Sequence, residues 1–350
     1  MKKTIAATIL ALACFSICAS AQNSHHSHSP QSPHQSYQSS LPRDTSFNIA
    51  ATYQKAKKHH PFITLAETRL PEGVTAYEDL TYTTLHETPY GERPLHLNIY
   101  RPADKKRYPA LLLVHGGGWN SGDKSLQIPL AQEIASHGYV TIPVEYRLRP
   151  EAAYPAALHD LKTAVRWVRA NAKRYGIDAD HIAISGCSAG GQLATLMGIT
   201  NGSKRHEGNG EWQQYSSDIQ AVINIDGCST FISAHNIEEN NEQARKNNSI
   251  SLTAQWLGGL YDDAKENWTE ASPVAWVTDR SAPVCFINSL LGRYRDGKEE
   301  LISKLTDKGI YHESHQLMAN MHTFWFFHPW FYPTTRYMVQ FMDTVFKPEK

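Results

Sequence analysis

The chain has 350 residues, of which 41% are hydrophobic and 19% charged, a composition typical of a globular protein with a large buried core. Lys and Arg together number 34, as do Asp and Glu. This balance shows neither the basic excess of a nucleic-acid-binding protein nor the acidic excess of a solvating tail. The one long apolar run stands at the start of the chain, which excludes a polytopic membrane protein.

Residues 1–21 predict a cleaved secretory signal peptide. Two lysines precede an apolar run at residues 5–18, and Ala-Ser-Ala at 19–21 supplies the small residues typical of a cleavage site. The residues before the two cysteines of this run match a lipobox poorly, so lipid anchoring is the less favoured alternative. We therefore expect a secreted or periplasmic protein without a membrane span.

Residues 22–50 predict a flexible tether, because they are rich in Ser, His, Gln and Pro and offer little to bury. The histidines of this segment are possible ligands of a transition metal, but we favour a solvated segment of low complexity. The remaining residues, 51–350, are expected to form one folded domain.

From residue 92 onward, strand-like and helix-like segments alternate. Predicted strands occupy residues 95–100, 110–114, 139–144, 181–185, 221–226, 284–288 and 315–318. Predicted helices occupy residues 124–137, 155–175, 189–199, 299–308 and 335–346. This alternation predicts a mostly parallel sheet with helices on both faces, and ligands bound at the carboxyl ends of its strands. The aromatic-rich insert at 228–282 is expected to form a small cap over that edge.

Two glycine-rich motifs follow predicted strands. Residues 186–190 read Gly-Cys-Ser-Ala-Gly and stand between a strand and a helix, the context that a nucleophile elbow requires. Residues 115–119 read His-Gly-Gly-Gly-Trp and follow another strand. Such glycines let the backbone approach a substrate and direct N–H groups at a developing oxyanion.

With these motifs the sequence resembles the α/β-hydrolase family, in its esterase and lipase branch with the HGGG motif, over about residues 95–346. The resemblance implies that Ser188 is the nucleophile. It also implies an oxyanion hole formed by Gly117, Gly118 and the backbone N–H of Ala189. No metal or organic cofactor is expected for this chemistry.

The resemblance extends to residues 144–160, which are similar to the family's Y-R-L-x-P-E segment. The charged residues of this segment match structural positions of the family. We interpret them as a buried polar brace and not as catalysts: Glu145, Arg147, Glu151 and Asp160.

A nucleophilic serine needs a general base, which is most often histidine. The family places this residue in the loop after the last strand, and His322 stands a few residues beyond the strand predicted at 315–318. His315 falls inside that strand, and His328 lies in an aromatic run where packing is its expected role. We therefore expect His322 to be the base.

The acid of the triad departs from the family pattern. Relatives carry it just after the strand equivalent to residues 284–288, where this chain has Gly292. We rank Asp226, at the end of an earlier strand, ahead of Asp296, with Glu299 third. The last two also read as a capping box at a helix start, which gives them a structural alternative.

These features together predict a secreted serine carboxylesterase. The sequence also resembles esterases of polysaccharide-degrading bacteria, which remove acetyl, feruloyl or methyl groups, so the expected substrate is a small-molecule or glycan ester. Trp119 and Arg293 are candidate substrate-binding residues, Arg293 for a uronate carboxylate, although a surface ion pair with Asp296 is the favoured interpretation of Arg293. Other possible functions are a general short-chain lipase or esterase, a serine peptidase of the same fold, and an inactive hydrolase-fold binding module.

Overall fold

The computed structural model describes residue 41 and residues 44–346. The predicted signal peptide and most of the predicted tether lie outside the described residues. The tether prediction is wrong for residues 44–50, because Phe47 and Ile49 pack on the core of the domain. The Phe47 N–H donates to Ser121 Oγ at 3.1 Å, and helix α2 (Ile49–Lys57) begins two residues later.

The centre of the domain is an eight-stranded sheet in the order β2-β3-β5-β4-β6-β7-β8-β9. Its strands are β2 (Val74–Thr88), β3 (Gly91–Pro102), β4 (Tyr108–Val114), β5 (Val140–Val144), β6 (Ile177–Cys187), β7 (Ala221–Ile225), β8 (Val284–Asn288) and β9 (His312–Gln316). From β5 to β9 all neighbours are parallel, whereas β2, β3 and β5 pair antiparallel. The predicted mostly parallel sheet is thereby confirmed.

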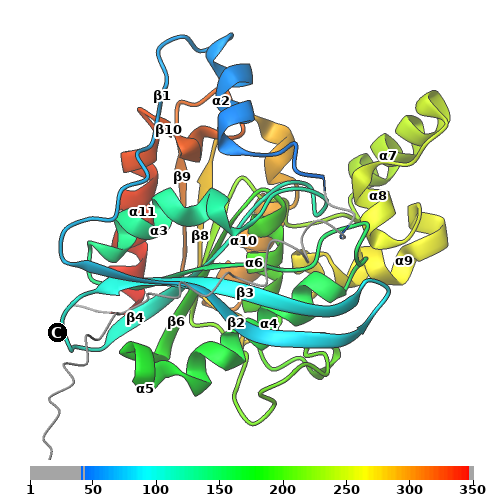
Figure 1. Ribbon diagram of the computed structural model, residues 1–350. Coiled ribbons are helices and arrows are strands. Elements are labelled where there is room, and N and C mark those ends of the chain that lie inside the picture. The colour runs from blue at the N-terminus through cyan, green and yellow to red at the C-terminus, as the bar shows by residue number, and fades with distance from the viewer. Residues whose placement is uncertain (1–40, 42–43, 347–350) are drawn as a thin grey trace, which may run out of the picture. The chain divides into compact units, whose positions relative to one another are not determined.

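Helices cover both faces of this sheet (Figure 1). Leu112 and Val114 of β4 belong to the core that packs under α4 (Ala156–Ala170), α6 (Ala189–Ile199) and α10 (Lys298–Asp307). Leu111 and Leu113 of β4 point to the opposite face of the sheet and belong to a second core. That core lies under α3 (Ile128–Ala135) and α11 (Phe331–Phe346). A strand that is buried on both faces appears in the sequence as a continuous apolar run. The strand at residues 110–114 could therefore be predicted from the sequence.

The polar edges of the sheet differ most from the sequence-based expectation. The long strand β2 was not predicted, because its residues are mostly exposed or half-buried and its pairing with β3 shifts register three times. At the opposite edge, the strand predicted at 315–318 is β9, which begins and ends earlier, at His312–Gln316. Both edge strands carry mostly exposed or half-buried side chains, so neither shows the apolar run of the central strands.

Some helices differ in their limits from the predicted segments. The helix predicted at 155–175 is interrupted at Asn171, which separates α4 from α5 (Ala172–Tyr175). The segment predicted at 124–137 begins as a short 3₁₀ turn, η1 (Lys124–Gln127), before α3. The final helix begins at Phe331, four residues earlier than predicted. Among residues 44–346, no helix combines the length and apolarity that a membrane span requires.

The insert between β7 and β8 is helical. It contains α7 (Ala234–Asn247), α8 (Leu252–Leu257), α9 (Tyr261–Glu270) and η3 (Pro273–Ala275), and the three longer helices lie together in Figure 1. Trp256 and Trp268 of this insert are buried. Trp256 stacks on Trp119, with ring centroids 4.5 Å apart and planes 10° apart, so the insert is fixed to the loop that follows β4.

Candidate active site

The turn between β6 and α6 holds Ser188 in a conformation with φ 56° and ψ −121°, a strained arrangement for a residue other than glycine. Small neighbours make this turn possible. A Cβ on Gly186 would stand 2.0 Å from the Gly190 carbonyl oxygen, and one on Gly190 would stand 2.3 Å from the Val114 carbonyl oxygen. The strained serine between two obligatory glycines is the local geometry of a nucleophile elbow.

Ser188, His322 and Asp226 form a continuous chain of contacts. His322 Nε2 lies 2.8 Å from Ser188 Oγ, and His322 Nδ1 lies 3.2 Å from Asp226 Oδ2. These distances suit a nucleophile, its general base and a carboxylate that orients the base. The three residues come from the β6–α6 turn, the loop after β9 and the end of β7, so the carboxyl edge of the sheet brings them together.

The Asp226 carboxylate is buried and held by further donors. The Ser289 N–H donates to Asp226 Oδ1 at 2.9 Å, and Asn288 Nδ2 donates to the same oxygen at 3.3 Å. Asn288 ends β8, the neighbour of β7 in the sheet, and Ser289 follows it directly. Sequence reasoning missed them, because the hydrogen bonds depend on the strand order. They leave Oδ2 directed at the His322 ring.

The His322 imidazole is enclosed. The ring of Tyr294 stacks on it with centroids 3.4 Å apart and planes 7° apart, and Trp325 meets it edge-on at 5.2 Å. Burial lowers the pKa of His322 below its usual value, the contact with Asp226 opposes this shift, and the positive charge of Arg293 adds to it. A buried histidine with a lowered pKa is neutral at neutral pH, the state that accepts a proton.

The alternative acids have other partners. Asp296 Oδ2 accepts hydrogen bonds from Ser233 Oγ and Asn236 Nδ2, at 2.7 and 2.6 Å, and so binds the start of α7. The capping-box interpretation is wrong for Asp296, because α10 begins after Gly297 in a left-handed conformation and has no side-chain cap. Glu299 is exposed and forms an ion pair with Lys298 at 3.2 Å.

The HGGG loop lies against the elbow. A Cβ on Gly116 would stand 2.7 Å from the Cys187 carbonyl oxygen, so only glycine permits this approach. Gly117 has φ 121°, and its carbonyl oxygen accepts from the N–H groups of Asn120 and Ser121. Of the three residues expected to form the oxyanion hole, Gly118 and Ala189 line the cavity at Ser188 and Gly117 closes the turn beside them.

The charged residues of the segment after β5 form buried ion pairs. Arg93 binds Glu145 and Glu151, each at 2.7 Å, and Arg147 binds Asp160 at 2.6 Å. Arg93 was missed from the sequence, since it stands on β3, far from the segment that it braces. These pairs fix the polypeptide beside the HGGG loop.

Ser188 and His322, which contact each other, line two different cavities. The serine-side cavity, of about 340 Å³, is lined by Ser188, Ala189 and Gly118, with Trp119 among its walls. The histidine-side cavity, of about 820 Å³, is lined by His322 and by α2 and its flanking residues. Arg293 lines both cavities.

The two candidate substrate-binding residues occupy different places. Trp119 is buried, and its indole N–H donates to Gln192 Oε1 at 3.1 Å, so it is a fixed wall. Arg293 lies over the ring of Tyr294 and donates to its hydroxyl at 2.6 Å. The expected surface pair between Arg293 and Asp296 is therefore replaced by a contact with Tyr294.

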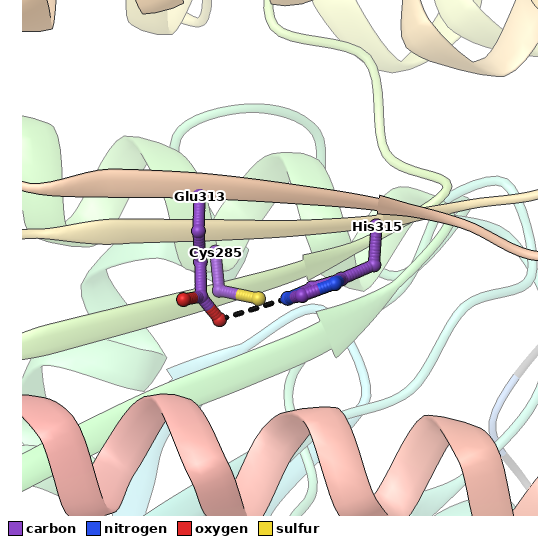
Figure 2. A group of neighbouring side chains, drawn as sticks. All are labelled: Cys285, Glu313 and His315. Carbon is purple, nitrogen blue, oxygen red and sulfur yellow. Dashed lines mark hydrogen bonds and ion pairs between the residues drawn. The ribbon is translucent and has the colours of Figure 1, made fainter.

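Within the described residues, one group of side chains has the composition of a metal site: Cys285, Glu313 and His315 (Figure 2). Cys285 pairs with Glu313 in the β8–β9 register, and His315 Nε2 lies 2.9 Å from Glu313 Oε1. Burial, reinforced by Glu313, raises the pKa of the Cys285 thiol, whereas a metal would require the thiolate. His315 also stacks on Tyr337 of α11, so we interpret the group as packing between sheet and helix.

A family model described as BD-FAE matches residues 97–290, more than half of the chain. Among curated proteins, Esterase LipC of Mycobacterium tuberculosis is 29% identical over 64% of this chain and 55% of its own length. Carboxylesterase NlhH of the same species is 34% identical over 38% of this chain and 39% of its own length. The chain thus spans about half or less of these relatives.

Solved structures are similar at the level of fold. A bifunctional GH43-CE protein of Bacteroides eggerthii aligns over 77% of this chain and 38% of its own, with a TM-score of 0.64 and 23% identity. A truncated carbohydrate esterase from gut microbiota aligns over 80% and 99%, with a TM-score of 0.62 and 21% identity. Esterase 2 of Thermogutta terrifontis aligns over 80% and 98%, with a TM-score of 0.61 and 22% identity. The expected α/β-hydrolase fold is confirmed.

Proposed function

The chain belongs to the BD-FAE family, and on that premise we propose that it is a serine carboxylesterase acting through Ser188, His322 and Asp226. The observation that carries the proposal is the unbroken chain of contacts from Ser188 Oγ through the His322 ring to Asp226 Oδ2, at 2.8 and 3.2 Å. The names of the curated relatives, which are esterases and a carboxylesterase, support the same reaction.

In the acylation step, Ser188 Oγ attacks the carbonyl carbon of the ester and passes its proton to His322 Nε2. The Asp226 carboxylate stabilises the imidazolium through Nδ1. The carbonyl electron pair moves onto oxygen, where the N–H groups of Gly117, Gly118 and Ala189 are the proposed donors. Ala189 is the first residue of α6, so the positive end of the helix dipole adds to this stabilisation.

The tetrahedral intermediate then collapses with cleavage of the ester C–O bond, and the leaving alcohol takes the proton from His322. Water attacks the acyl-Ser188 and gives a proton to His322, which returns it to Ser188 Oγ as the carboxylic acid departs. The lowered pKa of His322 keeps the imidazole neutral and ready for each attack.

We propose that the substrate is an acylated or methyl-esterified polysaccharide or oligosaccharide, and that the protein is exported to meet it. The predicted signal peptide supports export. Trp119 and Phe231, which line the serine-side cavity, offer aromatic surface to the ring of an acyl group such as feruloyl. Two of the solved structures that share the fold carry the words carbohydrate esterase or CE in their names.

The test is a panel of acetylated, feruloylated and methyl-esterified polysaccharides, together with p-nitrophenyl acetate. Released acid or methanol is measured for the wild type and for Ser188→Ala as the matched blank. Release from at least one glycan by the wild type alone is the expected result. Hydrolysis of p-nitrophenyl acetate without release from any glycan would contradict the glycan substrate, and no hydrolysis at all would contradict the esterase.

A further inference from the structure

The histidine-side cavity has a polar lining of one charge sign. Its volume is about 820 Å³, and the polar side chains around it include Thr52, Lys55, His59, Arg293 and Asn320. Within the described part of the chain, the residues that line it include no Asp or Glu. An open, cationic cavity directly beside a candidate catalytic histidine requires a chemical explanation.

Helix α2 builds one wall of this cavity and is firmly placed. The Asn48 side chain accepts from the Ala51 N–H and caps the helix. Tyr53 packs against Phe327 with ring centroids 5.9 Å apart, which turns one side of α2 to the core. Thr52 and Lys55, three residues apart and so on one face of the helix, line the cavity. In Figure 1, α2 (blue) stands apart from the insert helices α7, α8 and α9.

The two permanent cations of the cavity lack carboxylate partners. Among the described residues, Lys55 and Arg293 form no ion pair, and Arg293 contacts the ring and hydroxyl of Tyr294. Two acids of neighbouring segments, Asp226 and Asp44, have other partners. Asp226 is buried behind the His322 ring, and Asp44 binds the Ser46 N–H and Asn120 Nδ2. An anion placed here would therefore meet positive potential without displacing an existing pair.

The proposed mechanism decides which part of an ester enters this cavity. His322 Nε2 gives its proton to the leaving alcohol, so the alcohol lies on the side of His322. The acyl carbonyl must lie beside Ser188 and the N–H groups of Gly118 and Ala189, which line the other cavity. The acyl group therefore occupies the serine-side cavity, and the alcohol portion occupies the histidine-side cavity.

We propose that the histidine-side cavity is a subsite for an alcohol portion that carries a carboxylate, as in a saccharide that contains a uronic acid. This inference rests on the proposed esterase function and names its substrate class. Lys55 and Arg293 bind the carboxylate, while Thr52 and Asn320 offer hydrogen bonds to sugar hydroxyls. Lys55 and Arg293 are specificity-determining residues, since they recognise the substrate away from the reacting atoms.

A matched pair of esters tests the proposal. 4-Acetoxybenzoate and 4-acetoxybenzamide share the acetyl group and the shape of the leaving phenol, and differ in one negative charge. In the wild type we expect kcat/KM to favour the carboxylate. In Lys55→Gln the ratio of the two kcat/KM values should fall about tenfold, chiefly through KM for the carboxylate, with a further fall in Lys55→Gln/Arg293→Gln.

Lys57→Gln is the matched control, because it removes the same charge from the same helix. The Lys57 side chain contacts the Tyr53 hydroxyl and does not line the cavity. It should keep the wild-type ratio. An unchanged ratio in Lys55→Gln, or an equal fall in Lys57→Gln, would overturn the proposal.

A second measurement needs no turnover and separates this inference from the proposed function. Calorimetric titration of Ser188→Ala with methyl glucuronoside and with methyl glucoside should detect binding of the acidic sugar alone, and Lys55→Gln in that background should abolish it. If the acidic sugar binds but the wild type hydrolyses no ester, the proposed function is overturned. Ester hydrolysis with equal affinity for the two sugars would overturn the subsite.

Discussion

The two cavities at the carboxyl edge of the sheet share Arg293 but are built from different material. The serine-side cavity has walls that belong to the core: Trp119 is buried and stacks on Trp256 of the insert. The histidine-side cavity is walled by α2, a helix without a fully buried residue. A wall that belongs to the core gives its cavity a fixed shape. A wall on a surface helix places charged side chains in its cavity at little cost in the stability of the fold. Under the proposed assignment of the cavities, the two halves of a substrate would therefore be selected by different physical means.

The largest effect on the rate of ester hydrolysis is expected at Ser188. Ser188→Ala should lower the rate of ester hydrolysis by a factor on the order of 10³ or more, because it removes the oxygen that forms the bond to the acyl carbon. The control is Ser185→Ala, which removes a buried hydroxyl without a hydrogen-bond partner from β6, the strand that precedes Ser188. If a folded Ser188→Ala protein kept a tenth of the wild-type rate, Ser188 would not be the nucleophile.

The next effect separates the two candidate acids. Asp226→Asn should keep the fold and lower kcat by roughly 10² to 10⁴, because an amide cannot stabilise the imidazolium. Asp296→Asn should have little effect, since the amide oxygen of Asn can still accept from Ser233 and Asn236 at the start of α7. Steady-state kinetics of both variants decide the assignment, and the opposite ranking of kcat would refute it.

Stability measurements test whether the two walls differ as described. Trp256→Ala removes a fully buried ring and its stack on Trp119, so we expect a loss of about 3–5 kcal/mol in the free energy of unfolding. Lys55→Gln changes an exposed side chain and should stay within about 0.5 kcal/mol of the wild type. Denaturant titration provides both values. A similar loss of unfolding free energy in the two variants would show that the two cavity walls do not differ in their contribution to stability.

A smaller effect concerns acyl selectivity. Leu252 at the start of α8 lines the serine-side cavity beside Gly118, and it is 48% exposed, so it can be shortened without opening the core. Leu252→Ala should raise kcat/KM for p-nitrophenyl butyrate relative to the acetate by about three- to tenfold, because the cavity gains length. The preference between 4-acetoxybenzoate and 4-acetoxybenzamide should not change. A variant that altered only this second preference would reverse our assignment of the two cavities.

The smallest effect is a shift of the pH profile. Since His322 must be neutral to accept a proton and burial lowers its pKa, activity should persist below pH 6.5 and be lost as the pH falls through that pKa. The charge of Arg293 contributes to the lowering, so Arg293→Gln should move the acid limb of kcat/KM to higher pH. Arg295→Gln, a nearby charge change, is the control. A shift of the limb to lower pH would contradict this electrostatic coupling.

Much of the fold could be predicted because the central strands are buried on both faces and read as apolar runs. Ser188 could be singled out because its motif stands between such a strand and a helix. His322 required only the position of the last strand, and the error of a few residues in β9 did not matter. These predictions rest on local sequence and on a sheet order typical of the fold.

What could not be predicted depends on tertiary contacts. Asp296 follows a pattern that fits a helix cap, yet the left-handed Gly297 separates it from α10 and its carboxylate turns to α7. Lys55 stands in a short helix just after the low-complexity segment, and only the packing of Phe47 and Tyr53 brings it beside His322. No periodicity in residues 49–57 could indicate which cavity the helix would face.

The stacking of Tyr294 on His322 has a consequence for proton transfer through the imidazole. With Tyr294 stacked on one face at 3.4 Å and Trp325 in a T-shaped contact at 5.2 Å, a rotation of the imidazole by half a turn about its Cβ–Cγ bond would disturb both ring contacts. Such a rotation would exchange the two nitrogens between Ser188 and Asp226. In the proposed mechanism, contacts that oppose this rotation keep Nε2 as the nitrogen that both receives the proton and returns it, to the alcohol or to the serine. The aromatic neighbours would thereby favour a single orientation of the His322 ring throughout the proposed catalytic cycle.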